Sequence, residues 1–263
     1  LVLAADNTYT GGTDIRQGTL SVSRDANLGA ASGGLMLSGG MLTTTASFDT
    51  ARAVKVSAAS GLAVSAGSTL GLGGAITGNG ELTKSGAGTL RIFGSGSAYT
   101  GNLLVEAGTL DIASAATLGG SLAVSSGAQL QGAGQVGTTT LRSGAILAPG
   151  NLGGVLTVAG DLTLLPGSTY QVAADPASSA SARVAVTGAA NLAGSVVHIG
   201  PEGGFDNTRQ YTILTAGAIN GQFDTVSSNY AYLAPTLQYA AQNVTLQLER
   251  KQVPVNPVDP ATP

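Results

Sequence analysis

Short runs of alternating apolar and polar residues recur along the whole chain. A period of two is the pattern of a β-strand with one buried face. Gly, Ser, Asn or Asp ends each run after a few residues, which leaves almost no room for a helix of 12 residues. Even 41–60, which lacks Gly and Pro, is rich in Thr and Val and favours strands. The alternating apolar residues are Leu20 and Val22, Val54 and Val56, Leu110 and Ile112, Leu122 and Val124, Leu162 and Leu164, Val184 and Val186, and Val244, Leu246 and Leu248.

The chain also repeats itself. Nine of the 21 positions from Tyr9 to Gly29 recur 90 residues later, among them the triplets Tyr9-Thr-Gly and Gly18-Thr-Leu. A shorter period of 20 residues lies inside this one. It separates Leu42, Leu62 and Leu82, and again Leu90, Leu110 and Leu130. Strands that recur about every 20 residues are typical of a solenoid, so we expect a parallel β-helix.

A β-helix of this period is a rod. Coils of about 20 residues, each adding a strand spacing of about 4.8 Å, predict about 12 coils and a length of about 60 Å. The two ends of such a rod expose unpaired strand edges, which need a cap or further coils. The N-terminal end at Leu1 shows no cap, so we expect that further coils precede it.

Composition narrows the class of protein. The 263 residues include 40 Gly and 9 Pro but no Trp, only 4 Phe and 7 Tyr, and 43% hydrophobic residues. Gly has no three-residue period, which excludes collagen, and the apolar content supports a folded core. The net charge of -3 favours neither nucleic acid nor an anionic membrane as a partner. The absence of Cys excludes disulfides and thiolate chemistry.

The C-terminal half differs from the rest. Seven of the 11 aromatic residues lie at or after Tyr170, and we expect these larger side chains to close the end of the rod over its last coil. The chain then ends in 251–263, where Pro254, Pro257, Pro260 and Pro263 recur every third residue. This spacing predicts an extended polyproline II linker.

Two sets of motifs resemble bacterial autotransporters, the type V secretion proteins. The first set resembles their passenger-associated repeat and comprises Gly80-Glu-Leu-Thr-Lys-Ser-Gly-Ala-Gly-Thr-Leu-Arg-Ile, Tyr99-Thr-Gly and Glu106-Ala-Gly-Thr-Leu. The second resembles their autochaperone region and comprises Gly144-Ala-Ile-Leu-Ala-Pro-Gly-Asn, Leu156-Thr-Val-Ala-Gly-Asp-Leu-Thr-Leu, Gly167-Ser-Thr-Tyr, Val184-Ala-Val-Thr-Gly, Leu192-Ala-Gly, Tyr211-Thr-Ile-Leu-Thr-Ala, Ile219-Asn-Gly-Gln-Phe, Tyr232-Leu-Ala-Pro-Thr-Leu and Val244-Thr-Leu-Gln-Leu. One position departs from the family, which commonly has an acidic residue where this chain has Ala182.

The resemblance implies an all-β, single-stranded right-handed β-helix. It divides the chain into passenger repeats over 1–143, a C-terminal cap and autochaperone over 144–250, and the linker 251–263, which leads toward an outer-membrane β-barrel absent from this chain. It also implies export through the periplasm and outer membrane to the cell surface or the medium. The physics of a one-dimensional stack agrees with an autochaperone, because each coil gains stability only from a formed neighbour.

Three classes of function follow. The first is a stalk that templates its own folding, presents an upstream region and acts as a monomer. The second is an adhesin surface for host proteins or glycans. The third is an enzyme: either a β-helix carbohydrate enzyme, which needs clustered charges that this chain lacks, or a serine protease domain elsewhere in the parent protein. We favour the first and expect that this segment is not an enzyme.

Candidate chemistry is sparse. His198, the single His, lies in a strand-like Val196-Val-His-Ile segment, and no Gly-x-Ser-x-Gly elbow accompanies it. Gly132-Ala-Gly-Gln-Val-Gly137 matches a dinucleotide-binding pattern, but Thr-rich sequence and another turn follow it instead of a helix. Asn243-Val-Thr245 is a glycosylation sequon in an expected strand, and Glu202 and Asp206 flank an expected solvated turn. We therefore expect no catalytic, cofactor-binding or metal-binding residues, and no cofactor.

Overall fold

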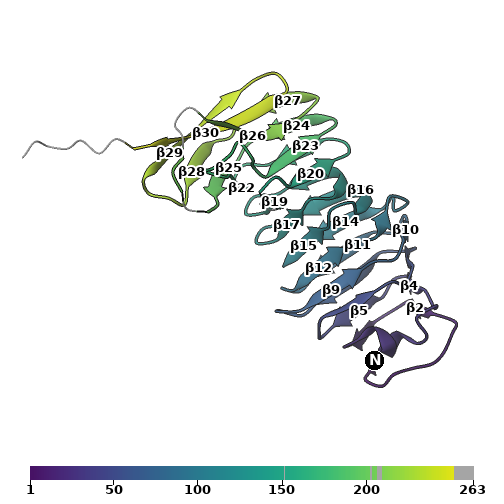
Figure 1. Cartoon of the computed structure of the whole chain (residues 1–263). Helices are drawn as coiled ribbons and strands as arrows, with labels where there is room; N and C mark the ends of the chain where they lie inside the picture. Colours follow the sequence, from purple (N-terminus) through teal and green to yellow (C-terminus); the bar gives the residue numbers. More distant parts are fainter. Residues whose placement is uncertain (151, 202, 206–208, 252–263) are drawn as a thin grey trace, which may run out of the picture.

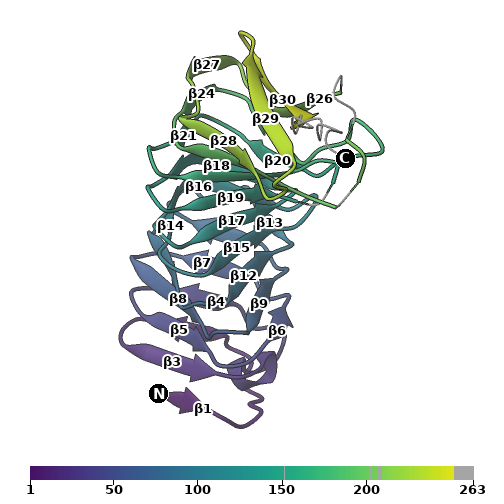
Figure 2. The same ribbon diagram turned by 90° about the vertical axis from the view of Figure 1, so that its left-hand side faces the viewer.

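The computed structural model describes residues 1–150, 152–201, 203–205 and 209–251, and these residues form an elongated β-solenoid (Figures 1 and 2). Parallel strands stack along the rod, and within the described part the helical structure is one 3-10 turn, η1 (Asp25–Leu28). The described residues hold no helix with the length and hydropathy needed to cross a membrane. The predicted all-β parallel solenoid is confirmed.

The coil has three faces, and the strands of each face stack on those of the next coil. Sheet C comprises β6 (Phe48–Thr50), β9 (Thr69–Leu72), β12 (Thr89–Ile92), β15 (Thr109–Ile112), β17 (Gln129–Gly132), β19 (Ile146–Pro149), β22 (Thr169–Ala173), β25 (Ser195–Ile199) and β28 (Thr225–Ser228). Sheet B comprises β2 (Thr13–Ile15), β4 (Leu35–Leu37), β7 (Val54–Val56) and β10 (Ile76–Gly78).

Sheet A has 17 strands, because two long strands join two faces of the coil. Its members are β1 (Val2–Leu3), β3 (Thr19–Val22), β5 (Met41–Thr44), β8 (Ser60–Val64), β11 (Leu82–Ser85), β13 (Ser95–Gly96), β14 (Asn102–Val105), β16 (Thr117–Val124), β18 (Gln135–Leu141), β20 (Val155–Val158), β21 (Leu162–Leu164), β23 (Arg183–Val186), β24 (Ala189–Leu192), β26 (Gln210–Thr215), β27 (Ala218–Gly221), β29 (Leu233–Tyr239) and β30 (Asn243–Arg250).

A glycine corner bends the two long strands from one face to the next. Strand β16 pairs with β18 on both sides of an irregularity between Leu118 and Ser121. Gly120 adopts a φ of 71° there, and a Cβ on Gly137 would lie 1.9 Å from the Gly120 carbonyl oxygen. Glycine is needed at position 120 for the positive φ and at position 137 for this close approach of two backbones.

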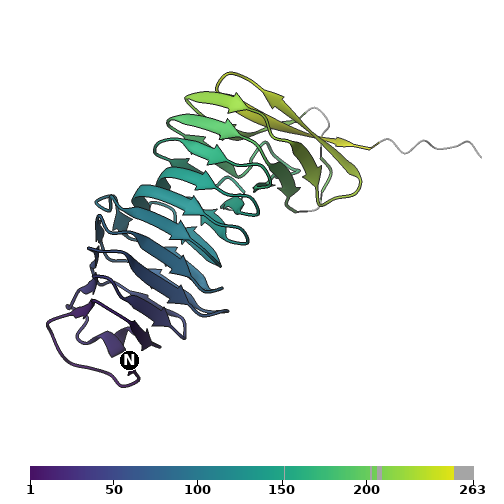
Figure 3. The same cartoon turned by 180° about the vertical axis from the view of Figure 1, so that it is seen from behind.

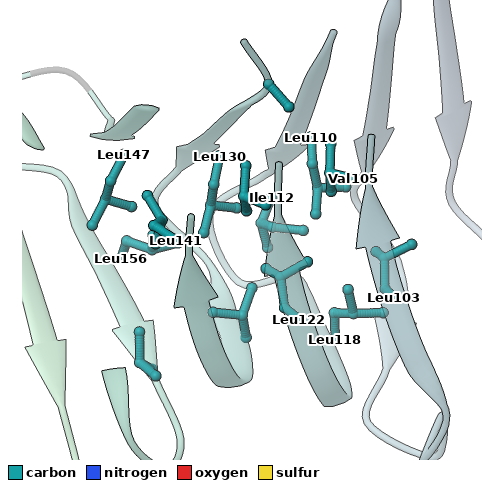
Figure 4. Close-up of a cluster of buried hydrophobic side chains, with 14 of the residues drawn as sticks. Leu103, Val105, Leu110, Ile112, Leu118, Leu122, Leu130, Leu141, Leu147 and Leu156 are labelled. Atoms are coloured by element: carbon teal, nitrogen blue, oxygen red, sulfur yellow. The ribbon is translucent and has the colours of Figure 1, made fainter. Parts of the chain in front are cut away.

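The core is a set of side-chain ladders that run along the rod. One ladder in sheet C stacks Leu70, Leu90, Leu110, Leu130 and Leu147, all at most 1% exposed. Figure 4 shows part of this core, where Leu110, Leu130 and Leu147 lie beside leucines of sheet A. Each rung repeats the one before, so the 20-residue period predicted for Leu90, Leu110 and Leu130 is confirmed.

The second predicted ladder, through Leu42, Leu62 and Leu82, is wrong at its last rung. Leu42 pairs with Leu62, but Leu62 then pairs with Lys84, whereas Leu82 pairs with Ser60. The coil is two residues longer here than the average period. A charged side chain therefore takes an inward position that the sequence pattern assigned to leucine.

The predicted number of coils is also wrong. Sheet C holds nine stacked strands, which at 4.8 Å per step span about 40 Å, instead of the predicted 12 coils. The reason is that coils lengthen toward the C-terminus. Residues on successive rungs are 23, 26 and 30 positions apart from Leu147 through Tyr170 and Val196 to Val226.

The 90-residue repeat does not return to the same face. Gly18-Thr-Leu begins β3 in sheet A, whereas Gly108-Thr-Leu begins β15 in sheet C. Gly18 and Gly108 both have a positive φ. The repeated sequence therefore encodes a tight turn followed by a strand, and it serves at either face of the coil.

Candidate functional site

Aromatic side chains gather where the parallel stack ends. Strand β30 runs antiparallel to both β26 and β29, so the parallel order stops there. In Figure 3 these strands form the yellow end of the rod, beyond the last green coils. We call the antiparallel strands β29 and β30, together with Tyr170, His198, Phe205, Tyr211, Phe223 and Tyr230, the C-terminal cap.

Tyr170 ties the cap to the interior of the solenoid. It takes the rung of the sheet C ladder between Leu147 and Val196 and is 1% exposed. Its hydroxyl donates to the Ile213 carbonyl 43 positions later, and its ring stacks on Phe223 at 6.0 Å. Burial raises the pKa of the Tyr170 phenol far above its usual value, so the group is a neutral donor.

A second pair of rings packs within the cap. Phe205 and Tyr211 are buried with ring centroids 6.5 Å apart in an edge-to-face arrangement. The Tyr211 hydroxyl donates to the Asp175 carbonyl at 2.9 Å, which fastens β26 to the loop after β22. The departure from the family at Ala182 lies in the same region, fully buried immediately before β23.

His198 lies on strand β25, as predicted, but its side chain points into the core and is fully buried. Its Nδ1 is 2.9 Å from the Ser228 hydroxyl, and its ring meets Phe205 edge-on at 5.2 Å. Its Nε2 has no hydrogen-bond partner among the described residues. Burial lowers the pKa of His198 to about 4, so the imidazole is neutral at pH 7.

The pair of His198 and Ser228 lacks the arrangement of a nucleophile and its base. A catalytic base needs a third group to orient its other nitrogen, and an open position for the substrate. Here Nε2 is buried without a hydrogen-bond partner in the described structure, while the Ser228 hydroxyl also accepts from the Tyr230 amide at 3.1 Å. The arrangement fits a packed cap.

The remaining sequence candidates lie apart from one another. Gly132 ends β17 and Gly137 lies in β18, so the dinucleotide-like pattern forms a turn between strands without a helix. Asn243 and Thr245 lie in β30, as predicted. Glu202 and Asp206 lie outside the described residues. Within the described part of the chain, no three Asp, Glu or His side chains come together as a metal site.

Sequence reasoning missed two buried cations. Lys84 is fully buried, and its ammonium group lies within 3.3 Å of four carbonyl oxygens, those of Ser85, Gly86, Gly88 and Ala107. Burial lowers the pKa of Lys84 to about 8. The carbonyl oxygens come from its own turn and from the equivalent turn of the next coil, so the ammonium joins two successive turns.

Arg52 is the second buried cation; it is 3% exposed and follows strand β6 by two residues. Its Nε donates to Asp25 Oδ1 at 2.8 Å, and its other nitrogens donate to backbone carbonyls that include those of Gly29 and Ala30. Arg52 thus fixes η1 and the loop that follows it. These residues belong to a coil that precedes β6 and contributes no strand to sheet C. The position of Arg52 between Ala51 and Ala53 carried no hint of this role.

Comparison with known proteins places this architecture in a family. The passenger-associated-transport-repeat family matches residues 1–22 and 82–112. The BmaC autotransporter adhesin of Brucella suis is 34% identical over 288 aligned positions, which cover all of this chain and 8% of that protein. An extracellular serine protease of Serratia marcescens is 31% identical over 180 positions, which cover 64% of this chain and 17% of that protein.

The chain is an autotransporter passenger segment. It spans a small part of the length of both relatives. The two family matches in the passenger segment end at Val22 and Ile112, the last residues of β3 and β15. These are also the strands that begin with the repeated Gly-Thr-Leu triplet, so the internal repeat and the family repeat coincide.

Proposed function

We propose that residues 144–250 of this passenger segment are an autochaperone that templates the folding of the coils before them. Residues 1–143 then form a stalk that presents an upstream region at the cell surface. The observation that supports this best is the C-terminal cap. It closes the stack with antiparallel strands and interlocked aromatic rings, while its other side continues as an ordinary parallel stack.

The energetics of a one-dimensional stack favour nucleation at this end. A lone coil buries little surface, so the first coils form only where other contacts offset their loss of chain entropy. The hydroxyls of Tyr170 and Tyr211 supply such contacts, because they join strands to segments 43 and 36 positions away. Each later coil then adds to a preformed edge.

The order of export fits the same proposal. By family resemblance, the linker 251–263 leads to an outer-membrane β-barrel, the direct partner of this segment, and the passenger crosses the outer membrane after passing through the periplasm. A stable C-terminal end would then fold first outside the cell. The family places the passenger at the cell surface or in the medium.

Adhesion is the second candidate function. The supporting observation is that a protein named as an adhesin aligns with the whole passenger segment. A rod of stacked coils offers a repeating surface to host proteins or glycans. The protease relative raises the alternative of a stalk for an enzyme, but the buried setting of His198 supports a non-catalytic role for this segment itself.

Limited proteolysis in urea tests the template. The whole chain is exposed to a brief protease pulse at increasing urea, and the surviving fragments are identified by mass spectrometry. We expect a fragment of about residues 144–250 to survive to higher urea than any fragment of 1–143. Survival of an N-terminal core instead would contradict the proposal, as would a single transition that leaves no fragment.

A further inference from the structure

A groove of about 790 Å³ runs along the outer face of sheet C. It crosses strands β12, β15, β17, β19, β22 and β25, which stack one after another in Figure 1. The groove therefore follows the axis of the rod and lies at right angles to the strands. Its volume is in the range of small-ligand sites, about 300–1,000 Å³.

One register row explains why this face is hollowed. Arg91, Asp111, Gln131 and Ala148 are paired in register on four successive strands, and Gln171 follows on the next strand, one residue beyond the last pair of that ladder, Leu147 with Tyr170. Four of them are long or polar, and Ala148 leaves a dip between Gln131 and Gln171. The next row adds small residues at Ala133 and Gly150, so the dip continues sideways.

The polar groups of the groove are nearly neutral in sum. Arg91 and Asp111 form a loose ion pair at 3.6 Å, and burial raises the pKa of the Asp111 carboxyl. Gln131 accepts a hydrogen bond at 2.9 Å from the Gln129 amide, which fixes its orientation. The floor thus presents the amides of Gln131 and Gln171, which can donate and accept, two strand spacings apart.

The walls of the groove are apolar. Pro149, Leu152 and Ile199 line it, and Leu152 is 41% exposed. A site with an amide floor and aliphatic walls suits a ligand that carries hydroxyl groups on its edges and C–H groups on its faces. Sugar rings have this distribution of polar and apolar groups.

We propose that this groove binds a neutral oligosaccharide chain that lies along the axis of the rod. Its rings would step from coil to coil, with hydroxyls on Gln131, Gln171 and Asp111 and with one ring over Ala148. We expect a neutral ligand because Arg91, the one cation among the described lining residues, is already paired with Asp111. This inference rests on the second proposed function, adhesion, and is independent of the folding template, because it concerns a face of the finished rod.

An extended peptide fits the groove less well. A peptide binds a β-protein most simply by adding a strand to a free edge. Each strand from β12 to β25 pairs with a neighbour on both sides, so none of them is a free sheet edge, although the ladder between β19 and β22 ends at Leu147 and Tyr170. Binding here depends on side chains and on shape.

The test uses the whole chain of 263 residues. Binding is first measured on an array that holds neutral, sulfated and sialylated glycans, and then by calorimetry with neutral hexasaccharides of glucose, mannose and N-acetylglucosamine. We expect at least one neutral hexasaccharide to bind. Gln131→Ala and Gln171→Ala should each weaken that binding about tenfold, the effect of one lost hydrogen bond.

Two further variants give the matched controls. Gln135→Ala removes an exposed glutamine from sheet A, away from the groove, and should leave binding unchanged.

Ala148→Tyr fills the dip from an outward position and should abolish binding while thermal unfolding stays as in the unmodified chain. The proposal is overturned if no neutral glycan binds, if only charged glycans bind, if Ala148→Tyr still binds normally, or if a peptide library yields the ligand instead.

Discussion

The coils around Leu90 and Leu110 and the coils after Leu147 use one architecture with different means of support. In the first group, rungs repeat every 20 residues and leucine stacks on leucine. In the second, the interval grows to 30 residues, and Tyr170, Tyr211 and Phe223 are added to the aliphatic core. The comparison teaches that the repeat coils depend on their neighbours, whereas the last coils also hold themselves together by long-range contacts.

The largest expected effect comes from equivalent truncations in the two regions. Tyr170→Ala and Leu110→Ala each empty one rung of the same ladder and should each cost about 3–5 kcal/mol of unfolding free energy. Because Tyr170 also joins the cap, its loss should lower the protection of the whole chain. Leu110→Ala should leave the C-terminal coils protected.

Hydrogen exchange read by mass spectrometry separates these outcomes along the chain. The control is the unmodified chain at the same urea concentration. The proposed difference between the two regions is contradicted if Leu110→Ala lowers the exchange protection of residues after 147 first. It is also contradicted if Tyr170→Ala leaves the exchange protection of the repeat coils unchanged.

A smaller effect separates two costs of replacing a glycine in the repeat coils: the backbone strain of a positive φ, and the steric clash of an added Cβ with the neighbouring coil. Gly120 and Gly127 have nearly the same φ, 71° and 75°, but a Cβ on Gly120 would lie 2.0 Å from the Gly101 carbonyl oxygen, whereas one on Gly127 meets nothing within 4 Å. Gly127→Ala should cost about 1 kcal/mol for the positive φ alone. Gly120→Ala should cost about 3 kcal/mol.

Urea midpoints of the two glycine variants measure this difference directly. Since both substitutions add the same methyl group, the difference between them reports how closely successive coils approach at the corner of β16. Equal midpoints would show that the corner relaxes freely, and the tight stacking of the repeat coils would then be irrelevant to stability.

The last effect is a pH dependence confined to the cap, and it is small at neutral pH. His198 has a pKa of about 4 in the folded chain, below the value of about 6.5 for an exposed histidine, so the unfolded chain binds more protons between these values. Stability should be complete above pH 6.5 and fall as pH decreases toward 4, by at most about 1.4 kcal/mol per pH unit. His198→Gln should flatten the profile after residue 147 and leave the repeat coils unaffected.

Much of the solenoid could be predicted because local sequence patterns encode its strands. The alternation at Leu110 and Ile112 specifies a strand wherever it occurs, and the Leu90 ladder follows from constant coil length. The ladder through Leu82 failed because two extra residues moved Lys84 into its place. Sequence spacing alone cannot detect such a shift, since the carbonyl oxygens that compensate the buried ammonium appear only after folding.

The sequence predicted which kind of residues form the cap but not which of them contact one another. The enrichment of aromatic residues after Tyr170 indicated where the stack closes. The contacts of Tyr170 with Ile213 and of His198 with Ser228 join segments 43 and 30 positions apart, and no local pattern carries that information. The same limit applies to the groove, whose floor depends on the register of five strands.

The buried ammonium of Lys84 also helps to select the coil that stacks on its own coil during folding. Leucine rungs are interchangeable, so a chain of near-identical coils can thread one coil out of step with little loss of apolar contact. Lys84 is not interchangeable, because only the correct neighbour supplies the Ala107 carbonyl at 2.7 Å while Gly86 and Gly88 supply the others. A mis-threaded rod would bury this charge without its full set of acceptors. A single buried lysine in an otherwise aliphatic core thereby favours the correct pairing of successive coils.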